Sequence, residues 1–255
     1  MGVAAAGPGT PVGMSRLAAV TTLLLASASP ARLSTLRSAG IDPLVAVSAV
    51  DEPAVLAAAA DDAARAGRAP VPAGEQVLLL ARAKARDVRD HSPLAAGADL
   101  ILGCDSMLAL EGSDEVVGKP ADAADAAARW RRMRGRSGVL HTGHWLVRGG
   151  AGPAAGSGPA AGSGPAEVGA TSSTIVHFAD LSDAEVDAYV ATGEPLWVAG
   201  AFTVDGLGGP FVTGIEGDYH GVVGVSLPLL RTLLAEMGVG ITDLWTASAR
   251  AGASA

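Results

Sequence analysis

The sequence predicts one α/β domain with a mixed β-sheet, and two observations support that prediction. Apolar stretches short enough to be buried strands alternate with helical segments, in the order 20–26, 30–39, 45–50, 75–89 and 100–104. Two further strand-like stretches, 139–147 and 172–178, are predicted to form an antiparallel pair. The chain has 255 residues, which suffices for one such domain and does not require two.

The segment after the first strand is suited to bind an anion. Ser29 has the chemistry of a helix N-cap, and Pro30 suits the first helical position. Amides at the start of a helix that follows a strand point at whatever lies above the strand. We therefore expect Ser27, Ser29 and the following amides to form a phosphate cradle, with Arg32 one turn along the helix. The alternative is that Ser29 is only an N-cap.

The second and third predicted strands supply carboxylates. The strand at 45–50 ends in Asp51 and Glu52, and the strand at 100–104 is expected to deliver Asp105 at its carboxyl end. Ligands of open α/β sheets bind at the carboxyl ends of strands. Taken alone, Glu52 is also typical of a loop carboxylate, and Asp105 could cap the next turn.

Two lysines are candidate ligands for a phosphate. Lys84 lies in the predicted helix at 75–89, which is otherwise rich in Leu and Ala, and Lys119 lies in a Gly-Lys-Pro turn. Taken alone, such a helical lysine more often belongs to a solvated face. The histidines show no metal-ligand spacing and are predicted to be structural: His141, His144, His177 and His220.

The other expected elements rest on periodicity and on end signals. Ser182 and Glu185 have the spacing of a capping box at the start of one of these helices. The elements are a helix fragment and loop at 57–74, helices at 123–133, 182–192 and 226–237, and short strands at 200–204 and 211–215.

The predicted organisation is one domain with three less regular segments. Residues 1–18 are rich in Gly, Pro and Ala and are predicted to be a disordered extension, within which Met14 is an alternative start. The domain covers 19–246 and contains a flexible hairpin insert at 149–169, where Pro-Ala-Ala-Gly-Ser-Gly occurs twice. Residues 247–255 form a tail.

Charge and cysteine content argue against several classes of protein. The net charge is -8, which argues against a nucleic-acid groove. Cys104 is the sole cysteine, so an intrachain disulfide and a multi-cysteine metal site are excluded. No apolar run reaches the roughly 20 residues that span a bilayer, and we expect a cytoplasmic protein. A pattern at 14–28 that resembles a signal peptide is interpreted as the buried first strand.

The candidate residues together suit the hydrolysis of a polyphosphate. Several cations must converge on so anionic a substrate, and a divalent metal normally bridges its oxygens to carboxylates. A base must also deprotonate the attacking water. The chain offers these parts as Asp51, Glu52 and Asp105 with Arg32, Lys84 and Lys119.

Short motifs that contain these residues occur in a fixed order along the chain. They are Ser27-Ala28-Ser29-Pro30-Ala31-Arg32, Arg82-Ala83-Lys84-Ala85, Cys104-Asp105-Ser106 and Gly118-Lys119-Pro120. Further on come Tyr189, Gly193-Glu194-Pro195, Ala199-Gly200-Ala201-Phe202, Gly217-Asp218-Tyr219 and Val222-Val223-Gly224. Over about residues 20–240, this set resembles the Maf family of nucleotide pyrophosphatases, and an ordered set is much more specific than any one short motif.

The resemblance implies an elongated mixed-sheet α/β fold similar to that of inosine triphosphate pyrophosphatases, often as a homodimer. It implies hydrolysis of nucleoside triphosphates, including non-standard or modified ones, to monophosphates and pyrophosphate. Asp105 would accept a proton, and Glu52 and Asp105 would lie near Mg²⁺ or Mn²⁺. The implied substrate contacts are Ser27, Ser29, Arg32, Lys84, Ser106 and Lys119. No nucleic acid or membrane partner is expected. The alternative is a non-catalytic nucleotide-binding regulator, since the family has been linked to cell division.

Three positions depart from the family pattern. Ala31 stands where the family has an arginine, and Ser106 stands where it has a threonine. Asp205 stands where the branch preferring dTTP and UTP has glutamine, whereas the branch acting on 7-methyl-GTP also carries an acid there. An ionised carboxylate only accepts hydrogen bonds, which suits the adjacent donors of guanine. We therefore expect a guanine-type or broad substrate range; the alternative is that Asp205 only shapes the turn before Gly206.

Overall fold

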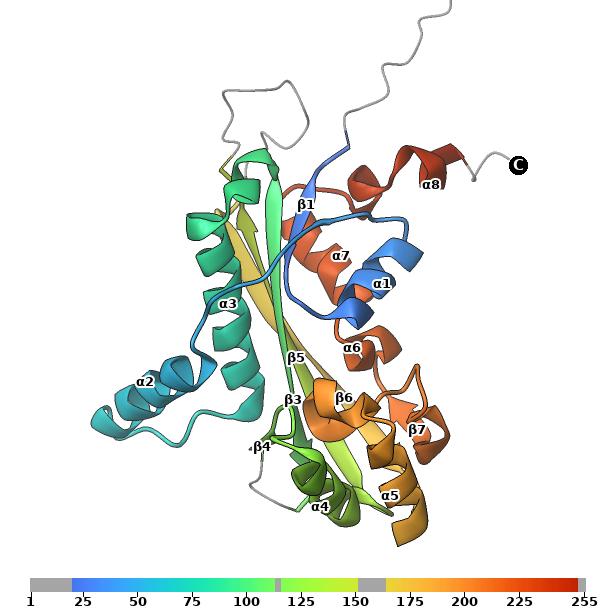
Figure 1. Cartoon of the computed structure of the whole chain (residues 1–255). Coiled ribbons are helices and arrows are strands. Elements are labelled where there is room, and N and C mark those ends of the chain that lie inside the picture. Colours follow the sequence, from blue (N-terminus) through green and yellow to red (C-terminus); the bar gives the residue numbers. More distant parts are fainter. Residues whose placement is uncertain (1–19, 113–115, 151–163, 252–255) are drawn as a thin grey trace, which may run out of the picture.

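The long strands of one mixed sheet form the axis of the molecule (Figure 1). The computed structural model describes residues 20–112, 116–150 and 164–251. The sheet has seven strands in the order β2-β1-β3-β5-β6-β7, with β4 paired to β3. β1 is parallel to β2 and β3, and the other pairs are antiparallel, which confirms the predicted mixed sheet. The strands are β1 (Leu23–Ala26), β2 (Leu44–Ala46), β3 (Leu100–Leu110), β4 (Val116–Val117), β5 (Ser137–Arg148), β6 (Glu167–Phe178) and β7 (Val212–Glu216).

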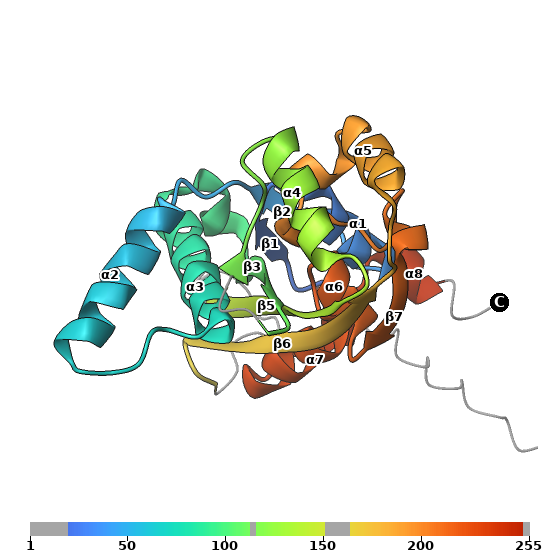
Figure 2. The same cartoon turned by 90° about the horizontal axis from the view of Figure 1, so that it is seen from below.

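Helices cover both faces of this sheet (Figure 2). Because side chains alternate along a strand, Leu102 and Cys104 of β3 face the core beside α7, whereas Ile101 faces α3. The α-helices are α1 (Pro30–Ser38), α2 (Glu52–Arg65), α3 (Ala73–His91), α4 (Ala123–Met133), α5 (Asp183–Ala191), α6 (Tyr219–Val223), α7 (Leu227–Glu236) and α8 (Ala247–Ala251). Short 3-10 helices are η1 (Pro93–Gly97), η2 (Glu194–Trp197), η3 (Ala199–Ala201), η4 (Gly209–Phe211) and η5 (Ile241–Leu244). Of the helices described, none is long and apolar enough to cross a membrane.

Two hydrophobic cores give the molecule the two lobes seen in Figure 1. The upper lobe (β1, β2, α1, α7) encloses a core that includes Leu25, Leu36, Leu102, Leu230 and Leu234. The lower lobe (α4, α5, η2, η3, β7) encloses a core that includes Leu108, Trp130, Phe178, Tyr189 and Phe202. Because β3 runs from one core to the other, its residues 105–107 lie between the lobes, at what we call the junction.

Glycine allows α3 to lie directly on the strands. A Cβ atom at Gly103 would overlap the carbonyl oxygen of Ala81, and one at Gly143 would overlap that of Val77. Both overlaps involve helix backbone, which cannot give way as a flexible side chain can. These two glycines therefore fix how closely α3 approaches β3 and β5.

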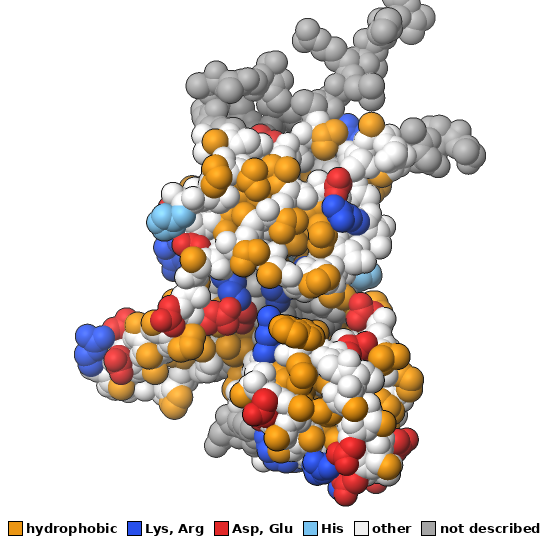
Figure 3. Space-filling view, in the orientation of Figure 1, with side chains coloured by type: hydrophobic (Ala, Val, Ile, Leu, Met, Phe, Trp, Pro, Cys, Tyr) orange, Lys and Arg blue, Asp and Glu red, His pale blue; other side chains and the backbone are white. Residues whose placement is uncertain are grey.

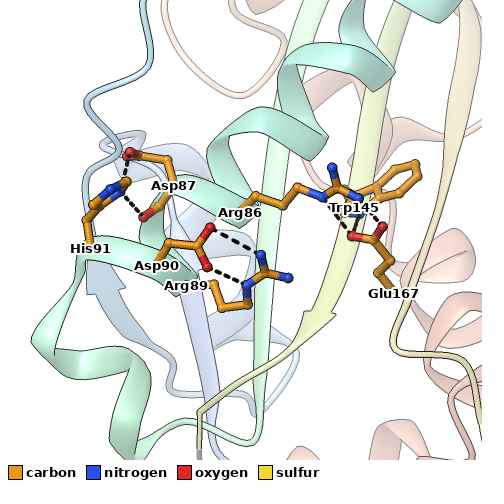
Figure 4. A network of polar contacts seen from close by, with 7 residues as sticks. All are labelled: Arg86, Asp87, Arg89, Asp90, His91, Trp145 and Glu167. Atoms are coloured by element: carbon orange, nitrogen blue, oxygen red, sulfur yellow. Dashed lines mark hydrogen bonds and ion pairs between the residues drawn. The ribbon is translucent and has the colours of Figure 1, made fainter.

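A polar network also ties α3 to the antiparallel strands (Figure 4). The Glu167 carboxylate accepts hydrogen bonds from both Arg86 Nε, at 2.9 Å, and Arg86 Nη2, and from Trp145 Nε1 at 3.1 Å. The Arg82 guanidinium lies 5.1 Å from the centre of the Trp145 ring, within cation–π range. The Arg86 hydrogen bonds are the main reason why the pKa of Glu167 is lowered to about 2.

Local end signals predicted several elements well. Ser29 caps α1, and its side chain accepts from the Arg32 amide. Ser182 and Glu185 form the expected capping box at the start of α5. The helix predicted at 123–133 has those bounds, and the predicted antiparallel pair is β5 with β6. Residues 1–18 and most of the predicted insert lie outside the described residues.

Four expectations about element bounds were wrong. β3 continues to Leu110 because β5 pairs with it throughout, so Asp105 lies within a strand and not at its end. The strand expected at 45–50 is β2, which ends at Ala46, and Glu52 begins α2, which Asp51 caps. Residues 200–204 form no strand, because Gly200 and Ala201 have φ values of 73° and 58°. β6 already begins at Glu167, inside the expected insert.

Candidate active site

Three predicted residues from three different elements meet at the junction. Lys84 Nζ on α3 lies 2.6 Å from Asp105 Oδ1 on β3 and 2.7 Å from Glu52 Oε1 on α2. The side chains of Lys84 and Asp105 are 12% and 10% exposed, whereas that of Glu52 is 46% exposed. Cationic and acidic side chains gather in the hollow between the lobes (Figure 3). The cluster therefore combines a buried ion pair with a carboxylate open to solvent.

The position of Asp105 follows from the pairing of β3. The last residue of β1 pairs with Gly103, so β3 has no parallel neighbour beyond that point. Asp105 lies on the face of β3 that α3 covers, as Ile101 and Gly103 do. It therefore lies just past the carboxyl end of β1, where ligands of such sheets bind.

Burial makes Asp105 a stronger base than an exposed aspartate. Desolvation raises its pKa, and the positive charges of Lys84 and Arg32 oppose that effect without cancelling it. A carboxylate with a raised pKa accepts a proton more readily near neutral pH. The environment of Asp105 thus suits the proton acceptor of a hydrolytic reaction.

The predicted phosphate cradle forms an ordered turn. The Ser27 hydroxyl accepts from the Ser29 amide at 3.2 Å, and the Ser29 hydroxyl accepts from the Arg32 amide at 3.4 Å. Both hydroxyls thus hold the turn, and the amide of Ala31 has no partner in the part of the chain that is described. That amide lies in the first turn of α1, where helix amides favour anions.

Arg32 points into the protein and joins several elements. Its Nε donates to the Gly224 carbonyl at 3.0 Å, and its Nη1 donates to the Cys104 carbonyl at 2.9 Å and to the Ser27 hydroxyl at 3.1 Å. Its Nη2 donates to the Ser106 hydroxyl at 3.1 Å. Most of its donors are therefore engaged by the protein, which leaves little of the guanidinium for a phosphate.

Ser106 links Arg32 to β5 and α6 through hydrogen bonds. Its Oγ lies 2.9 Å from Thr142 Oγ1, which donates to the Gly221 carbonyl at 2.8 Å. Since each hydroxyl has a single proton, Ser106 donates to Thr142 and accepts from Arg32. Thr142 was not predicted as a site residue, because a threonine within a predicted strand has no local feature that marks it.

Lys119 lies apart from this cluster, in a braced turn. The carbonyl of Gly118 accepts from the Gly200 amide at 3.0 Å and from Arg129 Nη1 at 2.8 Å. The Lys119 side chain is exposed, and no described residue forms an ion pair with its ammonium group. It is therefore available to an anionic ligand.

Asp205 lines a pocket between the lobes. The pocket has a volume of about 250 Å³ and lies between α1, α6 and the turn that carries Asp205. Tyr219 and His220 line it together with Ser34, Thr35, Ser38, Ala39, Val223 and Leu227. Six of these nine side chains carry a polar group, so the lining suits a ligand that forms hydrogen bonds.

The chain matches the family model described as Maf-like protein over residues 22–237. The chain belongs to the Maf family. A Maf-family relative from Salinispora tropica is 53% identical over 225 residues, covering 88% of this chain and 87% of the relative. Relatives from Streptomyces coelicolor and Rhodococcus jostii are 51% and 49% identical, and cover 88% and 91% of this chain and 94% and 99% of their own. All three are named nucleoside triphosphate pyrophosphatase.

Two carboxylates at the junction, Glu52 and Asp105, are the candidates to hold a metal. Within the described ranges, no three His, Cys, Asp or Glu side chains form a metal-binding group. Mg²⁺ is commonly bound through one or two carboxylates together with phosphate oxygens of the substrate. Glu52 and Asp105, which already converge on one cation, Lys84, fit a metal that binds together with its substrate.

Three of the four histidines predicted to be structural have hydrogen-bond partners within the protein, whereas His220 lines the pocket beside Asp205. His144 is buried, and its Nε2 accepts from the Ser226 amide at 2.8 Å. Burial lowers the pKa of His144 to about 4, which keeps the ring neutral and able to accept. His177 bonds to Ser137 and His141 to Ser173 across β5 and β6.

Proposed function

We propose that Asp105 is the proton acceptor of a nucleoside triphosphate pyrophosphatase whose active site is the junction between the two lobes. The class of reaction follows from the family and from relatives about half identical over most of their length. The chain is thus a hydrolase of acid anhydrides that converts nucleoside triphosphates to monophosphates and pyrophosphate. The observation that carries the assignment of Asp105 is its burial against Lys84 at the junction.

In the proposed reaction, Asp105 takes a proton from a water molecule as the water oxygen attacks the α-phosphorus. The bond between that phosphorus and the oxygen bridging to the β-phosphorus breaks, and pyrophosphate leaves with the bonding electrons. Lys84, whose ammonium group lies against Asp105, keeps the carboxylate in place and offsets negative charge. The exposed Lys119 and the Ala31 amide bind phosphate oxygens in this proposal.

We propose that Glu52 and Asp105 hold the metal, with Mg²⁺ or Mn²⁺ as the ion. Their oxygens are the hard ligands that these ions prefer. When bound, the ion neutralises part of the charge on the phosphates. Binding to both carboxylates competes with their contacts to Lys84, so metal affinity and the position of Lys84 are coupled.

The location of Asp205 supports a proposal about the base. The carboxylate lines a pocket large enough for a ring system, together with the Tyr219 ring. An acceptor-only group there favours a base edge with two adjacent donors, as in guanine. Asp205→Gln should move the ranking of nucleotides towards uracil and thymine, as measured by kcat/KM over a panel. An unchanged ranking would leave Asp205 only a role in shaping its turn.

Two further properties are proposed on indirect grounds. The buried Cys104, whose pKa burial raises to about 11, is an unreactive thiol. It suits the cytoplasm, where nucleotide substrates also occur. We also propose a homodimer, as the family resemblance implies; light scattering of the purified full chain would measure its mass.

The reaction is tested by product analysis of the wild-type chain. Nucleoside triphosphates, including modified bases, are supplied with Mg²⁺ or Mn²⁺, and nucleoside monophosphate, pyrophosphate and orthophosphate are quantified. The proposal requires monophosphate and pyrophosphate in equal amounts. Release of orthophosphate and nucleoside diphosphate would contradict the proposal. Nucleotide binding without any product would also contradict it, and is the result expected of a non-catalytic regulator.

A further inference from the structure

The lower lobe presents one aromatic side chain to solvent. Trp197, the last residue of η2, is 76% exposed, more than any other large hydrophobic side chain among the residues described. Exposing an indole to water forgoes the stabilisation that its burial would give. A single exposed apolar residue is ordinary. A function for Trp197 must therefore be argued from the contacts of the segment that carries it.

Hydrogen bonds to Glu194 anchor the start of η2, the helix that carries Trp197. Glu194, three residues earlier, accepts from the Tyr189 hydroxyl at 3.1 Å and from the Thr203 hydroxyl at 2.5 Å. It also accepts from the amides of Leu207 and Gly208, at 3.0 and 3.1 Å. These bonds tie η2 to the turn that contains Asp205, so one carboxylate holds both segments.

The segment after Trp197 adjoins the Lys119 turn. The Gly200 amide donates to the Gly118 carbonyl at 3.0 Å. A Cβ atom at Gly200 would come within 3.1 Å of the Leu108 side chain, so this segment also lies against β3, three residues beyond Asp105. The segments that carry Trp197, Lys119 and Asp205 are therefore joined to one another by hydrogen bonds, and all three side chains are exposed.

We propose that Trp197 is the platform on which the nucleobase of the substrate stacks. The inference rests on the proposed function and adds a residue that sets affinity. Every nucleobase has an aromatic face that can stack on an indole, whereas its edge is read by hydrogen bonds. In this arrangement the base lies at the edge of the pocket that Asp205 lines, with its face on Trp197, which is outside that lining, and Lys119 contacts a phosphate oxygen. A segment anchored by several hydrogen bonds suits this role, because less ordering is required on binding.

Steady-state kinetics of the full chain test the proposal with four proteins. These are wild type, Trp197→Ala, Trp197→Phe, and Leu94→Ala as a control at an exposed apolar residue on η1 in the other lobe. Stacking on an aromatic side chain contributes about 1–3 kcal/mol per base. Trp197→Ala should thus raise the nucleotide KM about 5- to 150-fold with little change in kcat. Trp197→Phe should recover most of that loss, and Leu94→Ala should match wild type.

Tripolyphosphate, which has no base, separates stacking from a general defect. Its inhibition constant should be the same in wild type and Trp197→Ala. An unchanged nucleotide KM in Trp197→Ala, or an equal loss of affinity for tripolyphosphate, would overturn the proposal. Dissociation of a dimer in Trp197→Ala with an unchanged KM would also overturn it, and would make the indole a contact between two copies of the chain.

Fluorescence keeps the test independent of turnover. Nucleotide binding should quench the tryptophan emission of wild type, and the quench should be lost in Trp197→Phe although the other three tryptophans remain. A quench of equal size in both proteins would contradict stacking on Trp197. If wild type binds nucleotide with this quench and yet releases no pyrophosphate, the proposed function fails while the stacking inference stands.

Discussion

Replacing Lys84 by methionine would measure how much the ion pair with Lys84 stabilises the folded protein with Asp105 buried and charged. The change removes the 2.6 Å contact to Asp105 and the 2.7 Å contact to Glu52, and retains most of the apolar stem. A hydrogen bond to a charged group contributes about 1.5–3 kcal/mol. The contact to the half-exposed Glu52 adds about 0–1 kcal/mol. We expect a loss of about 2–4 kcal/mol in the free energy of unfolding at pH 8.

The loss should depend on pH with a definite sign. Burial already raises the pKa of Asp105 in the folded state, and removing Lys84 raises it further, because Lys84 is the foremost group that opposes burial. A folded acid with a raised pKa binds its proton more tightly than the unfolded chain does. The folded variant therefore gains stability as pH falls through that pKa, and the difference from wild type should shrink from pH 8 to pH 5.

Urea denaturation without added metal measures this difference at both pH values. Asp105→Asn is the matched background: there no carboxylate charge remains at that position, so Lys84→Met should cost less, with no comparable change between pH 5 and pH 8. A loss of equal size at both pH values in the Asp105 background would refute the reasoning. So would a full loss in the Asp105→Asn background, which would assign the effect to packing alone.

Three further changes probe the frame around the site. Gly103→Ala would push α3 away from β3 through the overlap with the Ala81 carbonyl oxygen. We expect the free energy of unfolding, measured by urea denaturation, to fall by about 1–3 kcal/mol and kcat to fall as well. Wild-type values of both would contradict the close approach of α3 to β3. Glu167→Gln should destabilise the chain at pH 7 and match wild type near pH 2, because a lowered pKa gives stability that is lost as pH falls from about 4.5 to about 2; a constant difference across that range, by thermal unfolding, would contradict it. Thr142→Val removes the donor to the Gly221 carbonyl and should cost about 1–3 kcal/mol; no change in the unfolding midpoint would show that the Ser106–Thr142 link is dispensable.

Sequence features that act over a few residues predicted much of this fold. The N-cap of α1 by Ser29 and the capping box of α5 depend on side chains three residues apart and so can be recognised locally. Asp105 and Lys84 were proposed as site residues from two separate motifs and Glu52 from the predicted end of a strand, and the structure brings these three together. Nothing in the sequence around each residue indicated that Lys84 lies between the two carboxylates.

Features set by distant partners could not be predicted in this way. β3 extends past Asp105 because β5 pairs with it, and the sequence around Asp105 does not contain that partner. Arg32 was predicted to contact a phosphate; the bonds of its guanidinium to Gly224 and Ser106, far along the chain, could not be recognised from the residues around it. The expected strand at 200–204 failed because Gly200 and Ala201 take left-handed backbone angles, which the apolar pattern there does not reveal.

The most direct test of the central claim is the turnover of Asp105→Asn under saturating nucleotide and metal. Asp61→Asn, at an exposed position on α2, is the matched control. General-base catalysis contributes about 10²–10⁴-fold, so kcat of Asp105→Asn should fall by about that factor while nucleotide binding, measured by calorimetry, remains detectable. Asp61→Asn should turn over as wild type does. A kcat for Asp105→Asn within a few-fold of wild type would contradict the account and remove Asp105 from its proposed role.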